Sequence, residues 1–180
     1  MSDNNDDEES SLQLVDFSGV CNKLNSKWTL WVHLPHDIDW SLDSYKHIIS
    51  FSSVEEAIAL QELLPKKMLI NCMLFLMRKG IKPVWESEEN RNGGCFSYKV
   101  NNNNIVEVWK NLYYSLIGET LSDNIEFVKN INGITISPKK QFCIVKIWTS
   151  GFKFTNPSIL IKIPELNTNG CLFKKHKPEY

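Results

Sequence analysis

The sequence predicts a single α+β domain, in which antiparallel strands are interspersed with helices. Three observations predict this class. The segments 133–137 and 142–148 are apolar and typical of strands, and Pro138-Lys139-Lys140 between them favours the tip of a β-hairpin. The segment 105–117 repeats apolar side chains at helical spacing. A chain of 180 residues is also long enough for one domain with a substantial core.

The chain divides into a tail and one folded domain. Residues 1–20 begin with aspartate and glutamate side chains and are expected to form an acidic disordered tail, which leaves 21–180 as the domain. Apolar runs bounded by turn residues predict the strands of this domain. Besides the hairpin, strands are expected at 30–34, 48–51, 72–77 and 96–100. The pair Gly93-Gly94 is expected to give a tight turn before the last of these.

Helices are expected in three places. The first begins after Ser53, because Glu56 three residues later completes a capping box. The second is 105–117, and the asparagine run 101–104 before it is expected to be a turn. A short third helix is expected at 157–163, since a proline at its first position suits a helix start.

Composition and motifs exclude several classes of function. The net charge of −1 argues against a general nucleic-acid binder, which usually carries a strong basic excess. The five cysteines are scattered without a Cys-x-x-Cys pair, which favours free thiols over disulfides or a metal site. A signal peptide and a bilayer-spanning apolar run are both lacking, so we expect no membrane contact and a cytoplasmic location. The four histidines show no catalytic spacing, and we expect neither an enzyme nor a cofactor.

Trp85-Glu86 is the first indication of a ligand. An indole beside a carboxylate suits a flat cationic ring whose edge carries hydrogen-bond donors, such as a protonated or methylated guanine. Taken alone, the pair is more simply explained by a packed indole and a solvated glutamate. Trp40 favours the ligand, because the polar segment 37–41 gives a large aromatic side chain no obvious reason to be buried. Trp148 ends an apolar strand, and burial in the core is its alternative role.

The tryptophan-containing segments occur in the order and spacing of a known family. The segments are 28–31, Trp40, 51–56, 80–86 with Gly93-Gly94, 116–119 and 147–149. Over about residues 24–176 the chain resembles the eukaryotic translation initiation factor 4E family, whose members hold the 7-methylguanosine cap of messenger RNA. The resemblance implies a curved antiparallel sheet with helices on its convex face and a cap pocket on its concave face. It also implies an abbreviated third helix, because 148–176 is shorter than is usual in the family.

The resemblance assigns roles in the base pocket. Trp40 and Trp85 would sandwich the methylated base, whose positive charge strengthens stacking by about 2 kcal/mol for a desolvated cation–π contact. Glu86 would accept hydrogen bonds from the base N1–H and the N2 amino group. Trp148 would pack against the N7-methyl group. The implied function is cap binding in translation initiation, by a monomer, with capped messenger RNA as partner and with no metal or cofactor.

The phosphate side departs from the family pattern. At three positions where the family carries basic residues, this chain has Lys139, Ile144 and Cys95. The resemblance therefore leaves Lys139 as the retained charge, with Lys140 and Lys146 near enough in sequence to substitute. Lysine lacks the bidentate geometry of arginine, so a weaker grip on the triphosphate is expected. A solvated hairpin tip is the alternative explanation for the first two lysines.

The convex face departs further. Family partners carry a Tyr-x-x-x-x-Leu helix that docks on a tryptophan and a Leu-Glu pair, and here these positions read Ile58, Lys110 and Asn111. The partner-binding set implied by the resemblance is Leu24, Val54, Ile58, Lys110, Asn111 and Tyr114. An initiation-factor 4G-like scaffold or a 4E-binding protein would need a remodelled interface. Ser137, Gln141 and Ile144 are closer to the 4E homologous protein, a repressor, so the alternative function is a cap-binding translational repressor or sequestrator.

Overall fold

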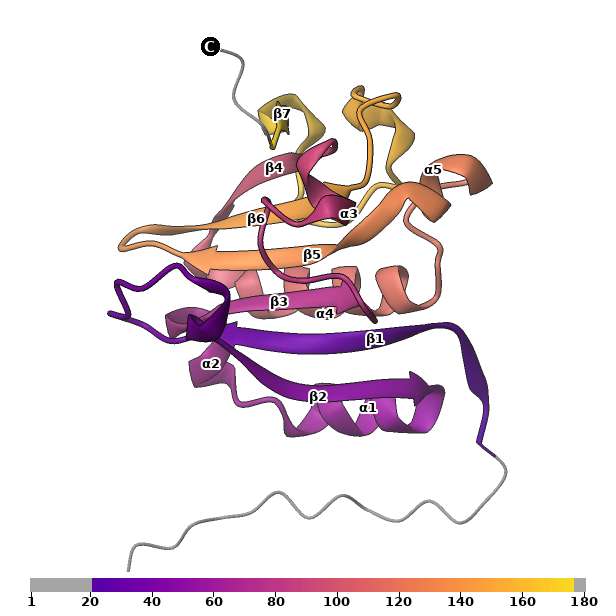
Figure 1. The fold of residues 1–180 in the computed structure, drawn as a ribbon. Helices are drawn as coiled ribbons and strands as arrows, with labels where there is room; N and C mark the ends of the chain where they lie inside the picture. Colours follow the sequence, from indigo (N-terminus) through magenta and orange to yellow (C-terminus); the bar gives the residue numbers. More distant parts are fainter. Residues whose placement is uncertain (1–20, 177–180) are drawn as a thin grey trace, which may run out of the picture.

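A curved antiparallel sheet forms the centre of the domain (Figure 1). The computed structural model describes residues 21–176, so the predicted tail 1–20 lies outside the described residues, as do 177–180. The strands are β1 (Lys23–His33), β2 (Tyr45–Ser53), β3 (Met73–Arg78), β4 (Gly94–Asn101), β5 (Ile131–Pro138), β6 (Phe142–Thr149) and β7 (Leu172–Lys175). They lie in the order β2-β1-β3-β5-β6-β4-β7, and each neighbouring pair is antiparallel.

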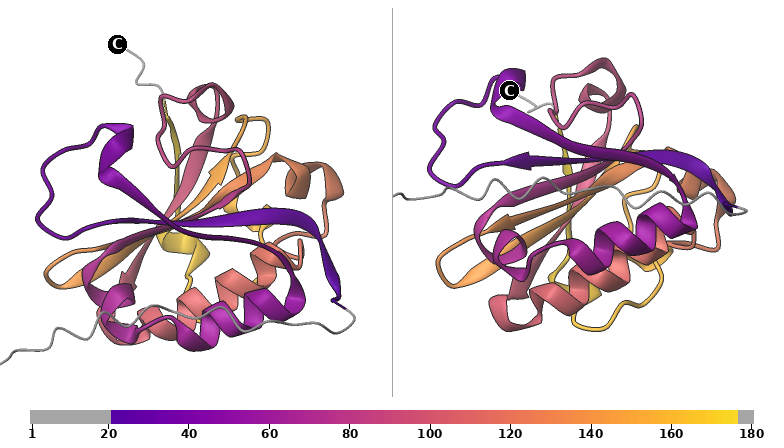
Figure 2. Two further views of the ribbon diagram at one scale, coloured as in Figure 1. Left: turned by 60° about the horizontal axis from the view of Figure 1, so that its bottom comes forward. Right: turned by 90° about the horizontal axis from the view of Figure 1, so that it is seen from below.

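The helices and two long loops lie on opposite sides of this sheet. The helices are α1 (Val54–Leu63), α2 (Lys66–Asn71), α3 (Glu88–Arg91), α4 (Ile105–Ile117) and α5 (Ile125–Asn130). Figure 2 shows α1, α2 and α4 along one face of the sheet, whereas the loops 34–44 and 79–93 rise on the other side. In the part of the chain that the structure describes, no helix is both long and apolar enough to cross a bilayer.

The core fills the space between the sheet and the helices. Side chains alternate between the two faces of a strand, so every second residue of the central strands points towards the helices. Those residues include Trp28, Leu30, Leu74, Leu76, Ile134, Ile136, Val145 and Ile147, and all are buried. They form one cluster with Trp109, Leu112 and Leu116 of α4. The alternate residues form a smaller cluster on the loop side, which contains Phe75, Met77, Cys95 and Trp148.

Several local predictions are confirmed. The hydroxyl of Ser53 accepts a hydrogen bond from the Glu56 backbone N–H (3.2 Å), and the Glu56 carboxylate accepts one from the Ser53 N–H (3.0 Å), which completes the capping box. The helix predicted at 105–117 has these bounds in the structure. The hairpin of β5 and β6 is also present, with Pro138 paired to Cys143.

Other predictions were wrong in extent or missed an element. β1 begins at Lys23 rather than at residue 30, because pairing with β2 and β3 keeps a polar segment extended. The helices α2 and α5 and the strand β7 were not predicted, since segments of four to six residues carry almost no periodicity. The helix expected at 157–163 is only a 3-10 turn, Pro157–Ile159, as the abbreviated third helix of the resemblance would require.

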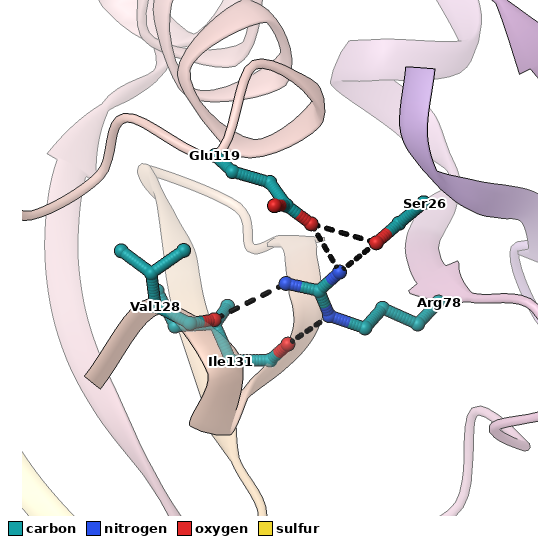
Figure 3. A network of polar contacts seen from close by, with 5 residues as sticks. All are labelled: Ser26, Arg78, Glu119, Val128 and Ile131. Carbon is teal, nitrogen blue, oxygen red and sulfur yellow. Dashed lines mark hydrogen bonds and ion pairs between the residues drawn. The ribbon is translucent and has the colours of Figure 1, made fainter. Parts of the chain in front are cut away.

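A polar network joins the sheet to the end of α4 (Figure 3). Arg78 donates to the carbonyls of Ile131 (2.7 Å) and Val128 (3.1 Å), and it forms an ion pair with Glu119 (2.6 Å). Ser26 donates to the same carboxylate (2.6 Å) and contacts the guanidinium. Burial by itself raises the pKa of the Glu119 carboxyl, but the hydrogen bonds from Ser26 and Arg78 outweigh it and hold the pKa below its usual range.

Candidate functional site

The loop after β1 presents Trp40. Asp37 accepts a hydrogen bond from the Asp39 N–H (3.0 Å), and the Asp39 carboxylate accepts from the N–H and the hydroxyl of Ser41 (both 2.8 Å). The bonds from Ser41 lower the pKa of the Asp39 carboxyl. The indole is 57% exposed, and one of its faces stacks on His33 with ring centroids 4.2 Å apart and planes at 5°. The other face of Trp40 is therefore the one available to a ligand.

The loop between β3 and β4 presents Trp85, which is 41% exposed. The fully buried Asn90 holds this loop, because its Nδ2 donates to the carbonyls of Lys82 (2.9 Å) and Val84 (2.8 Å). Its Oδ1 accepts a hydrogen bond from Asn132 of β5 (2.8 Å). The backbone on the N-terminal side of Trp85 is thus tied to the sheet through side-chain amides.

A hollow of about 380 Å³ lies between these two loops. Its lining residues are Leu42, Lys82, Val84, Glu86, Ser87, Glu88 and Glu89. The pKa of the Tyr45 hydroxyl is raised mainly by burial and further by the negative charge of Glu86, so this β2 residue lies near the carboxylate. None of the three indoles of Trp40, Trp85 and Trp148 lines the hollow.

A row of aromatic contacts crosses this face of the sheet. The His33 ring meets Tyr45 (5.2 Å), Tyr45 meets Phe75 (5.2 Å), and Phe75 meets Trp148 (6.4 Å), all edge to face. Through His33, the row joins Trp40 to Trp148. Trp148 is only 6% exposed, as the alternative role in the core required, yet its Nε1 has no hydrogen-bond partner among residues 21–176.

His176 covers Trp148 from the C-terminal end of the described chain, with ring centroids 4.6 Å apart. Its Nδ1 lies 2.8 Å from the Asn90 carbonyl, and its backbone N–H donates to Gly93 (3.0 Å). A carbonyl only accepts, so Nδ1 carries the proton. Burial lowers the pKa of His176, against the opposing effect of the bond to Asn90. Sequence spacing gave no signal for this contact.

Gly93 and Gly94 serve close packing rather than a strained turn. Among the described glycines only Gly80 has a positive φ. A Cβ on Gly93 would lie 1.8 Å from the Thr149 carbonyl oxygen, and one on Gly94 would lie 2.5 Å from that of Lys174. We expected these two glycines to allow a tight turn through their flexibility, but neither has a positive φ. Their role is to let neighbouring strands approach closely. The pair lets β4 begin between β6 and β7.

Two lysines lie near Cys95. By the resemblance, other family members carry a basic residue at this position. Burial raises the pKa of the Cys95 thiol, and the ammonium groups of Lys146 and Lys174 oppose this shift, so both charges are close. Cys95 pairs with Lys174 across β4 and β7. Sequence analysis missed Lys174 because the strand that carries it was not predicted.

The other predicted phosphate-binding residues lie farther from Trp148. The backbone N–H of Lys139 donates to the Phe142 carbonyl (2.8 Å), which is six residues before Trp148 and so roughly 20 Å away along β6. Lys140 is exposed at the hairpin tip. Lys146 precedes Trp148 by two residues, about 7 Å along the same strand. The structure therefore brings Lys146 closest to the indole, and leaves the two tip lysines apart.

The predicted partner-binding residues lie on β1 and on the helices. They are Leu24 on β1, Val54 and Ile58 on α1, and Lys110, Asn111 and Tyr114 on α4. The aliphatic side chain of Ile58 is 46% exposed. The two helices are joined by hydrogen bonds from Trp109 Nε1 to Gln61 (3.1 Å) and from the Tyr113 hydroxyl to the Ala57 carbonyl (2.8 Å).

Within residues 21–176 no group of three His, Cys, Asp or Glu side chains could hold a metal ion. Cys72, Cys95, Cys143 and Cys171 are free thiols.

Comparison with known proteins identifies relatives that are translation initiation factors. A relative from Eremothecium gossypii, eukaryotic translation initiation factor 4E, is 34% identical over 157 residues, which are 82% of this chain and 72% of that protein. Initiation factor 4E-2 of Schizosaccharomyces pombe is 35% identical over 70% of this chain, and the match spans 53% of that protein.

Solved structures agree with the fold. Ascaris suum eIF4E-3, solved with an m7G cap, is 28% identical and has a TM-score of 0.64, covering 73% of this chain and 75% of that one. C. elegans eIF4E-3, solved with the 4E-binding protein Mextli and a cap analog, has a TM-score of 0.66 at 23% identity, covering 73% and 76% of the two chains. A family model described as eukaryotic initiation factor 4E matches residues 23–176. The chain therefore belongs to the eukaryotic initiation factor 4E family.

Proposed function

We propose that this chain binds the 7-methylguanosine cap of messenger RNA and acts in translation initiation in the cytoplasm, as a monomer. Membership of a family of initiation factors makes it a binding protein rather than an enzyme. One observation carries the proposal: Trp40 and Trp85 stay half exposed on loops that hydrogen bonds hold in place. Full burial of a large apolar side chain stabilises a protein by roughly 1.5–3 kcal/mol, and both positions forgo part of this free energy.

The two indoles suit a flat cationic base. Methylation at N7 places a positive charge in the guanine ring, and an indole face attracts such a charge by about 2 kcal/mol when water is excluded. Trp40 has one free face, because His33 covers the other. A ligand therefore enters on that free face, and Trp85 closes over it from the second loop. Stacking on both sides favours the methylated base over plain guanine.

Glu86 gives the pocket its preference for guanine. Its side chain lines the hollow between the loops, and its negative charge contributes to the raised pKa of the Tyr45 hydroxyl. A carboxylate there accepts hydrogen bonds from the N1–H and the N2 amino group of guanine, each worth about 1.5–3 kcal/mol for a charged acceptor. Adenine lacks this pair of donors and is rejected. Trp148 lies at the N7-methyl side, and its burial suits a van der Waals contact.

The phosphate groups of the cap would bind to the lysines nearest to Trp148. Lys146 and Lys174 lie on either side of Cys95 and are the principal phosphate-binding residues of this proposal. Lys139 and Lys140 lie farther along the hairpin and suit the next nucleotides of a capped message. Because lysines bind phosphate as point charges, the triphosphate adds less affinity than an arginine fork would.

Retention on 7-methyl-GTP resin tests the proposal. The chain should elute with 7-methyl-GTP and not with the same concentration of GTP. Trp40→Ala and Trp85→Ala should each abolish retention without unfolding the protein. Leu63→Ala is the matched control, because Leu63 is as exposed as Trp40 but lies on α1. Full retention of either tryptophan variant, or equal elution by GTP, would exclude the proposed sandwich.

A repressor is the second candidate, favoured by the helix side. Solved relatives carry 4E-binding proteins. In this chain, the anchor position holds the aliphatic Ile58, and Lys110 with Asn111 replaces an apolar–acidic pair. An ordinary scaffold helix then loses its aromatic anchor and its carboxylate, and the bound cap is sequestered. A scaffold or 4E-binding protein that does bind must contact this altered surface.

A further inference from the structure

His33 lies directly beneath the exposed indole of Trp40. Its side chain belongs to the last residue of β1 and is 2% exposed, whereas Trp40 is 57% exposed on the loop. The two rings are almost parallel, at 5°, with 4.2 Å between their centroids. A ligand on the free face of Trp40 would thus make a stack of three rings, the lowest of which is fixed in the sheet.

The imidazole is held from several sides. In the register of the sheet, His33 pairs with Tyr45 of β2 and with Met73 of β3. Its Nε2 lies 2.8 Å from the Asp39 carbonyl, and since a carbonyl accepts, Nε2 carries the proton and donates. The ring therefore binds the backbone next to Trp40 and covers the indole face at the same time. Movement of the Trp40 plane would break the stacking contact.

We propose that His33 is a positioning residue, which orients Trp40 for the base. The inference rests on the proposed cap-binding function. A stacked aromatic pair is worth about 0.5–1.5 kcal/mol, which corresponds to a roughly threefold to tenfold loss of affinity if the indole must be ordered by the ligand alone. Replacement by phenylalanine keeps the flat support, whereas replacement by alanine removes it.

Titration of 7-methyl-GTP into the full chain and three variants tests the inference. At pH 8, His33→Ala should bind three- to tenfold more weakly than wild type, and His33→Phe within about twofold. His47→Ala is the control, because His47 contacts Trp31 edge-on. It should bind 7-methyl-GTP as tightly as wild type.

The outcomes separate this inference from the proposed function. Equal affinity of wild type and His33→Ala, or a His33→Phe variant as weak as His33→Ala, would overturn the positioning role. If wild type does not bind 7-methyl-GTP, the proposed function fails instead. The fluorescence of Trp40, taken as the difference between wild type and Trp40→Phe, then decides. A change of this fluorescence in His33→Ala that His33→Phe does not show supports the stacking role, and identical Trp40 fluorescence in wild type and His33→Ala overturns it.

Discussion

Replacement of Asn90 by alanine should loosen the loop that carries Trp85. The side chain is fully buried and makes three hydrogen bonds, to the carbonyls of Lys82 and Val84 and from Asn132. Each hydrogen bond makes a net contribution of about 1 kcal/mol to the free energy of unfolding. Carbonyls left buried without a partner lower this free energy further. Asn132 keeps its bond to the Glu89 carbonyl (2.9 Å), which limits the total. We expect Asn90→Ala to lower the free energy of unfolding by about 2–4 kcal/mol.

Urea unfolding followed by circular dichroism measures this change, and 7-methyl-GTP titration measures its effect on the site. The affinity should fall more than tenfold, because the Trp85 loop must be ordered by the ligand. Asn90→Asp should be at least as destabilising at pH 7, since a carboxylate oxygen would face two carbonyls. Asn92→Ala, at an exposed position of the same loop, is the control. A loss below about 0.5 kcal/mol for Asn90→Ala would refute the role assigned to this amide.

Three further changes test other parts of the molecule. Glu119→Gln should lower the free energy of unfolding by about 1–2 kcal/mol at pH 7. Because the folded pKa of Glu119 is lowered, this difference should shrink in thermal unfolding as the pH falls below about 4.5, and a constant difference would contradict the network. Lys146→Ala with Lys174→Ala should weaken 7-methyl-GTP by about 1–2 kcal/mol and leave 7-methylguanosine unchanged in calorimetry; an equal loss for both ligands would move the phosphates elsewhere. A Tyr-x-x-x-x-Leu peptide should bind at micromolar affinity or weaker, and Ile58→Trp with Asn111→Glu should tighten it; nanomolar binding to the unchanged chain would favour the ordinary initiation factor.

Elements specified by local signals were predictable. The helix 105–117 has a long apolar face, and Ser53 with Glu56 specifies a helix start within four residues. The exposed position of Trp40 also followed from its polar, loop-like neighbours. In each case the relevant contacts lie close in sequence, so the pattern is visible without the fold.

Features that depend on distant pairing were not predictable. Lys174 comes near Cys95 only because β7 pairs with β4, and β7 is a four-residue strand without a recognisable pattern. His176 reaches Trp148 for the same reason. The stack of His33 on Trp40 requires the conformation of a loop that aspartate side chains shape. Sequence can name such residues as polar or aromatic, but the partner is set by the topology.

The two halves of the proposed cap site differ in how they are built. The base half stands on buried contacts: the fully buried Asn90 behind Trp85 and the buried His33 beneath Trp40. The phosphate half consists of an exposed lysine, Lys174, and a half-buried one, Lys146. Exposed charges are screened over about 8 Å at physiological ionic strength, whereas buried contacts are screened much less. Salt should therefore weaken the contribution of the phosphates while the preference for the methylated base persists, which would place the specificity of the proposed site in its base half.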